Sequence, residues 1–159
     1  MLAKAVLPLV VLFILSACGG SSRETVAQGV QVRGNGYSFD RPRGWGMERP
    51  ANGAVARHGD ELVSVTRFPL RKAYDSAQFD EVAKELDRLA GRLADRAGTS
   101  LAASETVTVA GRKIRAYRYG DKRIGFVLEG TREYQLYCVR AEAACELLFS
   151  TFTLDGLPS

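Results

Sequence analysis

The sequence predicts an α+β domain, in which helices are packed on an antiparallel sheet. Three features lead to this prediction: strand pairs joined by short glycine turns, one long amphipathic helix in mid-chain, and a second apolar helix near the C-terminus. An apolar sheet face and an apolar helix stripe are buried together when the helix packs on the sheet. The predicted order of elements is ββ-ββ-α-ββββ-α.

The N-terminal segment has the features of a bacterial export signal. Lys4 precedes an unbroken apolar run at residues 5–15, which is shorter than the roughly 20 residues that a membrane-spanning helix needs. The run ends in the motif Leu15-Ser16-Ala17-Cys18. This motif resembles the lipobox of bacterial lipoproteins, in which small residues precede a cysteine that receives lipid and becomes the N-terminus. The resemblance implies a signal peptide at residues 1–17 and palmitate-like acyl chains on Cys18; an ordinary secretory signal is the alternative.

Residues 18–29 predict a flexible tether, because glycine and serine follow Cys18 and the stretch stays polar. A coil of this length spans on the order of 18 Å, so we expect the domain at residues 30–159 close to a membrane. The lipid on Cys18 would hold it in the cell envelope, on the outer face of the cytoplasmic membrane or on the outer membrane. The formal net charge of +4 is spread along the chain, which does not favour nucleic acid as a partner.

Short alternating segments predict the strands of the first half. They are residues 30–33 and 37–40, separated by a glycine-rich turn, and residues 54–58 and 62–68, which form a hairpin around Gly59-Asp60. Pro42 and Gly44 should stop the second strand, because proline cannot donate to a sheet ladder. Trp45 follows this stop, and we expect it to anchor the core rather than to serve as a ligand platform.

The clearest element is a helix at residues 76–97. Asp75 is a suitable N-cap, and Gly98 is a suitable residue just past the helix end. Apolar residues recur at the spacing of one helix face, namely Phe79, Val82, Ala83, Leu86, Leu89, Ala90, Leu93, Ala94 and Ala97. This stripe needs an apolar partner, and the strands around it are the candidates. The outer face is expected to carry surface ion pairs formed by Asp80, Glu81, Glu85 and Asp87 with Lys84 and Arg88.

A second hairpin is predicted at residues 105–109 and 112–119, with its turn at Ala110-Gly111. A two-residue turn places Val107 opposite Ile114, so the apolar residues of both strands share one face. The same register places Thr106 opposite Arg115. The remaining elements are strands at residues 123–129 and 133–139, which turn at Gly130, and a short helix at residues 141–152.

Several landmarks, taken in order, resemble the PsbP-like fold. They are Tyr37-Ser38-Phe39 before Pro42-Arg43-Gly44-Trp45, the mid-chain helix, the strand from Gly111 to Tyr117-Arg118-Tyr119, a late strand with Gly130, Tyr134, Leu136 and Cys138, and a terminal helix with Leu148, Phe149 and Phe152. The resemblance spans residues 37–154 and implies an α/β/α sandwich on an antiparallel sheet. It also implies a binding or assembly role, because members of this family mostly do not catalyse reactions. It carries over no functional residue.

Cys138 and Cys145 form an even pair once Cys18 carries lipid. Exported domains meet an oxidising environment, so a disulfide is the default expectation; two reduced, buried cysteines are the alternative. A fully extended chain between them would separate the α-carbons beyond the about 7 Å that a disulfide allows. We therefore expect the chain to reverse direction at residues 140–142, where the terminal helix begins.

The pattern indicates no catalytic, cofactor or metal site. His58 is the single histidine, and zinc sites and serine or cysteine hydrolases commonly need histidine as a ligand or base. Its place beside Gly59 on a predicted turn favours a solvated surface residue. We therefore predict that the protein is not an enzyme, and we assign it no cofactor and no metal ligand.

The densest basic and aromatic cluster is a candidate binding patch, formed by Arg115, Tyr117, Arg118, Tyr119, Lys122 and Arg123. Such a patch would contact an anionic glycan, a lipid headgroup or a partner protein. The alternative is a solvated strand face whose tyrosines pack under the terminal helix.

Two functions stay open for the anchored domain. The first is a non-enzymatic binding or assembly module of the cell envelope, which contacts the membrane through the lipid on Cys18 and binds an envelope protein or an anionic glycan. The second is a carrier that holds an apolar ligand between the long helix and the sheet. The carrier requires a cavity of several hundred cubic ångströms beneath the helix stripe. The lack of a second histidine weighs against a third function, an enzyme.

Overall fold

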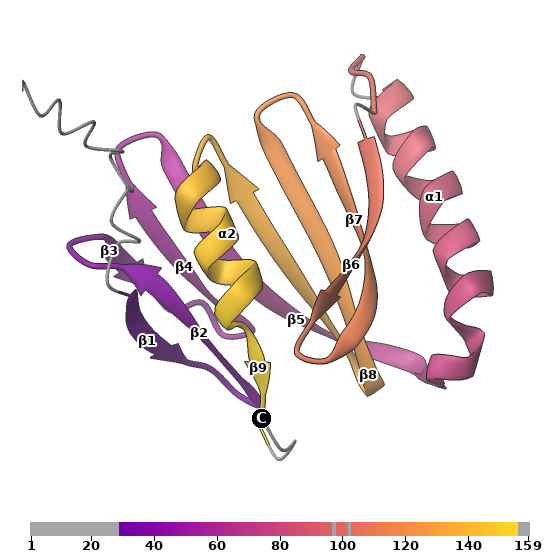
Figure 1. Cartoon of the computed structure of the whole chain (residues 1–159), viewed down its shortest axis with the longest axis horizontal. Helices are drawn as coiled ribbons and strands as arrows, with labels where there is room; N and C mark the ends of the chain where they lie inside the picture. The colour runs from indigo at the N-terminus through magenta and orange to yellow at the C-terminus, as the bar shows by residue number, and fades with distance from the viewer. Residues whose placement is uncertain (1–28, 97, 102, 156–159) are drawn as a thin grey trace, which may run out of the picture.

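The computed structural model describes residues 29–96, 98–101 and 103–155. The predicted signal peptide at residues 1–17, the lipidation site Cys18 and the tether up to residue 28 lie outside the described residues. The described chain is an α+β domain with two antiparallel sheets and two helices packed on them (Figure 1). This architecture confirms the predicted fold class.

The larger sheet has the strand order β3-β4-β5-β8-β7-β6. Its strands are β3 (Gly46–Glu48), β4 (Gly53–His58), β5 (Glu61–Tyr74), β6 (Ala103–Val109), β7 (Arg112–Tyr119) and β8 (Lys122–Val139). The smaller sheet has the order β1-β2-β9 and consists of β1 (Gly29–Arg33), β2 (Tyr37–Pro42) and β9 (Thr153–Leu154). The helices are α1 (Phe79–Arg96), preceded by the 3₁₀ turn η1 (Ser76–Gln78), and α2 (Glu142–Thr151).

The segment β8 folds back on itself near its middle. A straight strand of 18 residues would hold its ends roughly 60 Å apart, yet the flanking residues Asp121 and Arg140 share a backbone hydrogen bond of 2.8 Å. The first half pairs with β7 and the second half with β5, and Gly130 lies between the halves with φ 53°. Figure 1 shows the chain descending and returning along β8, in agreement with the predicted turn at Gly130.

The two helices lie on opposite faces of the larger sheet. Tyr117 and Arg118 are neighbours on β7, so their side chains point to opposite faces. Tyr117 donates to Asp87 of α1, whereas Arg118 donates to Glu142 of α2. The core lies between the larger sheet on one side and α2 with the smaller sheet on the other, and its largest buried side chains include Tyr37, Phe39, Ile114, Tyr134, Leu136, Leu148 and Phe152.

The predicted hairpin registers are confirmed. Val107 pairs with Ile114 and Thr106 pairs with Arg115. The strands β4 and β5 also form the expected hairpin, in which His58 pairs with Glu61. Both registers follow from two-residue turns, which fix the pairing of the flanking residues.

Several predicted boundaries are wrong. The strand β2 continues past residue 40 to Pro42, which occupies the terminal rung opposite Gly29, where the missing donor is tolerated. The strand β5 continues to Tyr74 because it resumes pairing with β8 beyond an irregularity after Pro69. The short strands β3 and β9 were not predicted, and residues 153–154 extend to pair with β2. These strands have too few residues to show a period of their own.

The ends of the predicted long helix are confirmed within the described residues. Asp75 accepts a hydrogen bond from the Ala77 backbone nitrogen at 3.0 Å, so it caps the opening turn, which is 3₁₀ before α1 begins. Gly98 has φ 64°, and Thr99 donates its backbone N–H to Ala94 at 3.0 Å, as at a glycine-terminated helix. In the described ranges, neither helix combines the length and the apolar character needed to cross a bilayer.

Candidate functional site

An apolar groove lies between α1 and the larger sheet. It contains a cavity of about 400 Å³. The helix contributes Leu86, Leu89, Ala90, Leu93 and Ala94, and the sheet contributes Tyr117, Tyr119, Ile124 and Phe126. A cavity of this volume, lined mainly by aliphatic and aromatic side chains, is typical of sites that take small apolar molecules.

The groove exists because α1 does not seat its whole apolar stripe on the sheet. Of the described α1 residues, Ala94 alone is buried, whereas Leu89 and Leu93 are 42% and 54% exposed. The predicted periodicity of the stripe is therefore present, but its expected burial is only partial. Opposite the stripe, Tyr117 pairs with Ile124 across β7 and β8, so their side chains share the face that α1 covers.

A polar contact joins α1 to β7 at one end of the groove. Asp87 accepts hydrogen bonds from Arg115, through Nε at 3.0 Å and Nη2 at 2.8 Å, and from the Tyr117 hydroxyl at 2.7 Å. Burial raises the pKa of Asp87, but these bonds and the Arg115 charge outweigh it and hold the pKa below its ordinary value. Burial first, and then the bond to Asp87, raises the pKa of Tyr117 well above its ordinary value. We call these three residues the Asp87 latch.

The latch overturns one prediction about α1. The charge pattern places Asp87 on the outer, solvated face of the helix, whereas the structure turns it toward the sheet. Asp87 lies four residues after Ala83 and three before Ala90, so it shares their helix face. Glu85 does remain outside and pairs with Arg88 at 2.8 Å. Spacing alone did not reveal that the partly buried Arg115 lies opposite Asp87.

The other end of the groove is a polar mouth beside the turn between β7 and β8. It is lined by Thr99, Tyr119, Gly120 and Lys122. Lys122 Nζ lies 3.0 Å from Asp121, whose carboxylate also accepts from Arg140 at 2.7 Å. The bonds from Arg140 and Lys122 lower the pKa of Asp121 to about 2, and burial raises the pKa of Tyr119. Lys122 is the one charged side chain among the described residues that line the groove.

Sequence reasoning missed the lining side chains of Thr99, Ile124 and Phe126. Ile124 and Phe126 alternate along β8 with Gly125 and Val127, which face the core. Apolar residues on both faces indicate a strand that is covered on both sides, and this signal could have placed Ile124 and Phe126 beneath a helix. Thr99 follows the end of α1 and gave no comparable signal.

The candidate binding patch divides between the two faces of the sheet. The α1 face carries Arg115, Tyr117, Tyr119 and Lys122, and the α2 face carries Arg118 and Arg123. The division follows from the alternation of side chains along β7 and β8. The six residues therefore do not form one surface, and the two tyrosines lie beneath α1 rather than beneath the terminal helix.

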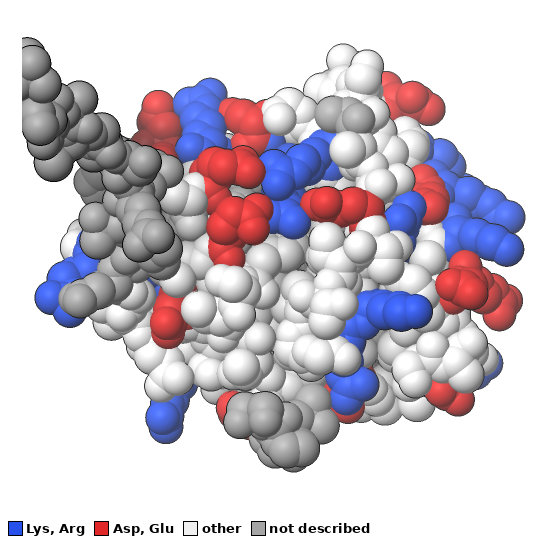
Figure 2. Space-filling view, in the orientation of Figure 1, with Lys and Arg blue, Asp and Glu red and all other residues white. Residues whose placement is uncertain are grey.

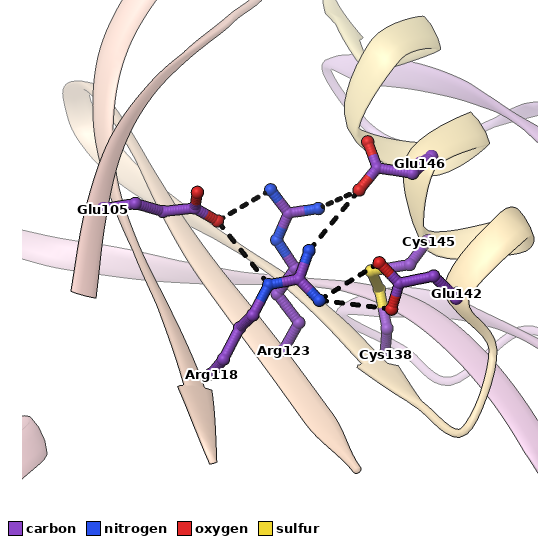
Figure 3. The surroundings of a disulfide bond; sticks show 7 residues. All are labelled: Glu105, Arg118, Arg123, Cys138, Glu142, Cys145 and Glu146. Atoms are coloured by element: carbon purple, nitrogen blue, oxygen red, sulfur yellow. Dashed lines mark hydrogen bonds and ion pairs between the residues drawn. A yellow bond between two sulfur atoms is a disulfide. The ribbon is translucent and has the colours of Figure 1, made fainter. Parts of the chain in front are cut away.

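Arg118 and Arg123 belong to an ion-pair cluster on the α2 side (Figure 3). Arg123 donates to Glu146 at 2.6 Å and to Glu105 at 2.9 Å, and Arg118 donates to Glu142 at 3.1 Å. Three carboxylates surround two guanidinium groups, so the cluster has no positive excess. Figure 2 shows acidic and basic groups mixed on this face. The cluster ties the strands to α2 and does not offer a site for an anion.

Cys138 and Cys145 form a disulfide, as the sequence predicts. Their α-carbons are 5.7 Å apart, within the range that a disulfide requires. Arg140 has φ 55° and turns the chain between β8 and α2, inside the interval where the reversal was expected. The bridge therefore fastens the first turn of α2 to the end of β8, beside the ion-pair cluster (Figure 3).

Trp45 and His58 lie together at the margin of the core. Their rings stack with centroids 6.0 Å apart. His58 is exposed, as predicted, with Nδ1 3.7 Å from Glu61. Trp45 is only partly buried, so it packs at the edge of the core rather than in its centre, because it precedes the edge strand β3. Among the described residues, no group of three or more His, Cys, Asp or Glu side chains is placed to hold a metal ion.

Comparisons with known proteins assign no function to this geometry. No family model matches the sequence, and no curated protein matches it. A solved structure from Bacteroides thetaiotaomicron VPI-5482 is similar over 83% of this chain, with 15% identity and a TM-score of 0.47. The match covers 51% of that protein's chain, so this chain spans about half its length. The PsbP-like resemblance therefore stays a prediction.

Proposed function

We propose that the protein is a membrane-anchored lipoprotein of the cell envelope that binds an apolar ligand between α1 and the sheet, without catalysing a reaction on it. The observation that carries this proposal is the cavity of about 400 Å³, which has leucine, isoleucine and aromatic walls. We prefer the carrier to the assembly module because the groove has a defined chemistry, whereas the candidate patch is divided between two faces.

The groove is suited to gain free energy from an apolar guest. Leu89 and Leu93 keep much of their surface in water, and covering such surface contributes roughly 25 cal/mol per Å². The Asp87 latch already fixes the middle of α1 on the sheet. Binding therefore requires little new ordering of the backbone, which reduces the entropic cost of binding.

The predicted anchor supports a ligand that comes from a membrane. The lipobox-like motif before Cys18 indicates lipid attachment, and two or three acyl chains hold a protein stably on a bilayer. A tether with a span on the order of 18 Å keeps the groove near the bilayer surface. Lipids and other membrane-derived apolar molecules are therefore the ligands that we propose.

Filling the groove tests the binding function. We expect the full chain carrying Cys18→Ala to enhance the fluorescence of a neutral naphthylamine dye, because this background has no attached lipid to compete. Adding Ala90→Trp places an indole in the cavity and should abolish the enhancement. Ala77→Trp adds the same side chain at an exposed position outside the groove and should leave it unchanged. Equal enhancement in all three chains would contradict the proposal.

Anchoring is tested separately at Cys18. Cys18→Ala should transfer the protein from the membrane fraction to the soluble fraction, because the acyl chains are its proposed membrane contact. Mass spectrometry of the wild-type protein should find an acylated N-terminal cysteine at this position. An unmodified N-terminus at another residue would remove the anchor from the proposal.

A further inference from the structure

We infer that the ligand of the groove is an anionic amphiphile, with one acyl-type chain and a carboxylate or phosphate head, and that Lys122 binds the head. This inference rests on the proposed function and adds the charge and the orientation of the ligand. Its basis is an apolar cavity that has the Asp87 latch at one end and, among the described lining residues, Lys122 as the single cation at the other.

The register of the sheet gives the groove its direction. Tyr119 pairs with Lys122 at the mouth, Tyr117 pairs with Ile124 in the middle, and Arg115 pairs with Phe126 at the latch. Lys122 and Phe126 are four residues apart on β8, which corresponds to about 13 Å along the strand. An acyl chain that lies over Ile124 and Phe126 therefore has its head beside Lys122.

The latch end does not suit an anionic head. Arg115 is the cation at this end, but Nε and Nη2 both donate to Asp87. Nη1 donates to Thr106 at 3.1 Å, and Nη2 also reaches Ser104 at 3.0 Å. An incoming anion would have to displace a carboxylate that already neutralises this guanidinium. The latch end is therefore the end for the apolar tail, because its cation is already paired.

Lys122, by contrast, has capacity to bind a ligand. Its side chain is 41% exposed, and within the described residues its ammonium makes one hydrogen bond, to Asp121, of the three that it can donate. Asp121 keeps Arg140 as a second partner at 2.7 Å. Lys122 can therefore turn toward a ligand head without leaving Asp121 unpaired. Tyr119 and Thr99 line the same mouth.

A cation at the rim of an apolar groove selects its ligand by charge. The ammonium of Lys122 attracts a carboxylate or phosphate and repels another ammonium group. It can donate a hydrogen bond to a neutral hydroxyl, but there is no charge attraction between them. An exposed ion pair contributes little, so we expect a preference of about fivefold in affinity. A fatty acid and a phosphorylated lipid share the required chemistry, and the two anionic arms of the experiment distinguish them.

The experiment is a competition for the groove of the full chain carrying Cys18→Ala. Dodecanoate, dodecyl phosphate, dodecanol and dodecylamine, all below their micellar concentrations, displace the neutral naphthylamine dye. Both anions should act at concentrations about fivefold lower than dodecanol, and dodecylamine should be weakest. Lys122→Gln should remove this order and Lys122→Glu should reverse it. Lys113→Gln removes a charge from an exposed position outside the groove and should change nothing.

Each result decides the inference. If dodecanol and dodecylamine compete as well as the anions, or if the anion preference survives Lys122→Gln, the inference is wrong while the apolar site stands. If none of the four ligands displaces the dye, the proposed function fails as well. Lys122→Arg keeps the charge and should keep the preference, which provides a second variant if Lys122→Gln does not fold.

Discussion

The helix with the more regular apolar pattern is the less buried of the two. The helix α1 has a long, regular apolar stripe, yet among its described residues only Ala94 is buried. The helix α2 is shorter, and it buries Ala144, Cys145, Leu148 and Phe149. The difference comes from what lies opposite each helix. The core formed by both sheets packs against α2, whereas α1 covers a cavity.

The helix α2 is also attached to the rest of the domain more firmly than α1. The disulfide and the core hold α2 along its length. The helix α1 depends on the Asp87 latch and on partly covered leucines. Regions with few buried apolar contacts open at lower free energy than the core. One side of the sheet is therefore closed and structural, and we expect the α1 side to adjust when a ligand enters.

Shortening one leucine in each helix should give the largest contrast. Leu148→Ala removes a fully buried side chain and should lower the free energy of unfolding by about 3 kcal/mol, because it leaves a cavity. Leu93→Ala, at a side chain that is 54% exposed, should cost less than about 1 kcal/mol. Chemical denaturation measures both values. Equal losses would show that α1 is packed as tightly as α2.

Reducing the disulfide should have a somewhat smaller effect, and it should fall on one helix. A bridge that closes a loop of about eight residues stabilises by roughly 2.5 kcal/mol in the chain-entropy model. Reduction should therefore lower the melting temperature without abolishing the fold, and amide exchange should accelerate in α2 but not in α1. Thiol labelling of the unfolded, unreduced mature protein checks the premise, because two free thiols per chain would exclude the bridge between Cys138 and Cys145.

Breaking the Asp87 latch should have a smaller effect on stability than reducing the disulfide, and it should act on α1. Asp87→Asn weakens the bonds from Arg115 and Tyr117, at a cost of about 1 kcal/mol, because the Asp87 side chain remains 40% exposed. Amide exchange should accelerate in α1 and stay unchanged in α2. Tyr117→Phe removes one of the bonds and should give a weaker form of the same result.

Acid should weaken the latch and, like Asp87→Asn, accelerate amide exchange in α1. The folded state lowers the pKa of Asp87 below its ordinary value of 3.8, so the latch contributes fully above that value and is lost as the pH falls through the folded value. Exchange of the α1 amides should therefore accelerate more steeply in acid for the parent than for Asp87→Asn. Identical acid profiles for the two chains would show that Asp87 does not carry the effect.

Local spacing was sufficient to predict a large part of this domain. The stripe of the long helix, its Asp75 cap, the pairing of Val107 with Ile114 and the turn at Gly130 each depend on residues that are close in sequence. The disulfide was also predictable, because its cysteines are only seven positions apart in the sequence and a chain reversal lies between them. Turn geometry and helix periodicity act over such distances, so the sequence alone determined these features.

Only the tertiary structure decided what the long helix does. Periodicity shows that Leu89 and Leu93 share a face, but it does not show how closely that face approaches β7 and β8. Two other errors had a local cause: helix spacing already places Asp87 on the face of Ala83 and Ala90, and strand alternation already places Tyr117 and Arg118 on opposite faces. Exposure and ion pairing depend on atoms that other elements bring from far along the chain. The sequence therefore predicted an apolar stripe, and the packing of α1 over the sheet made it the wall of a groove.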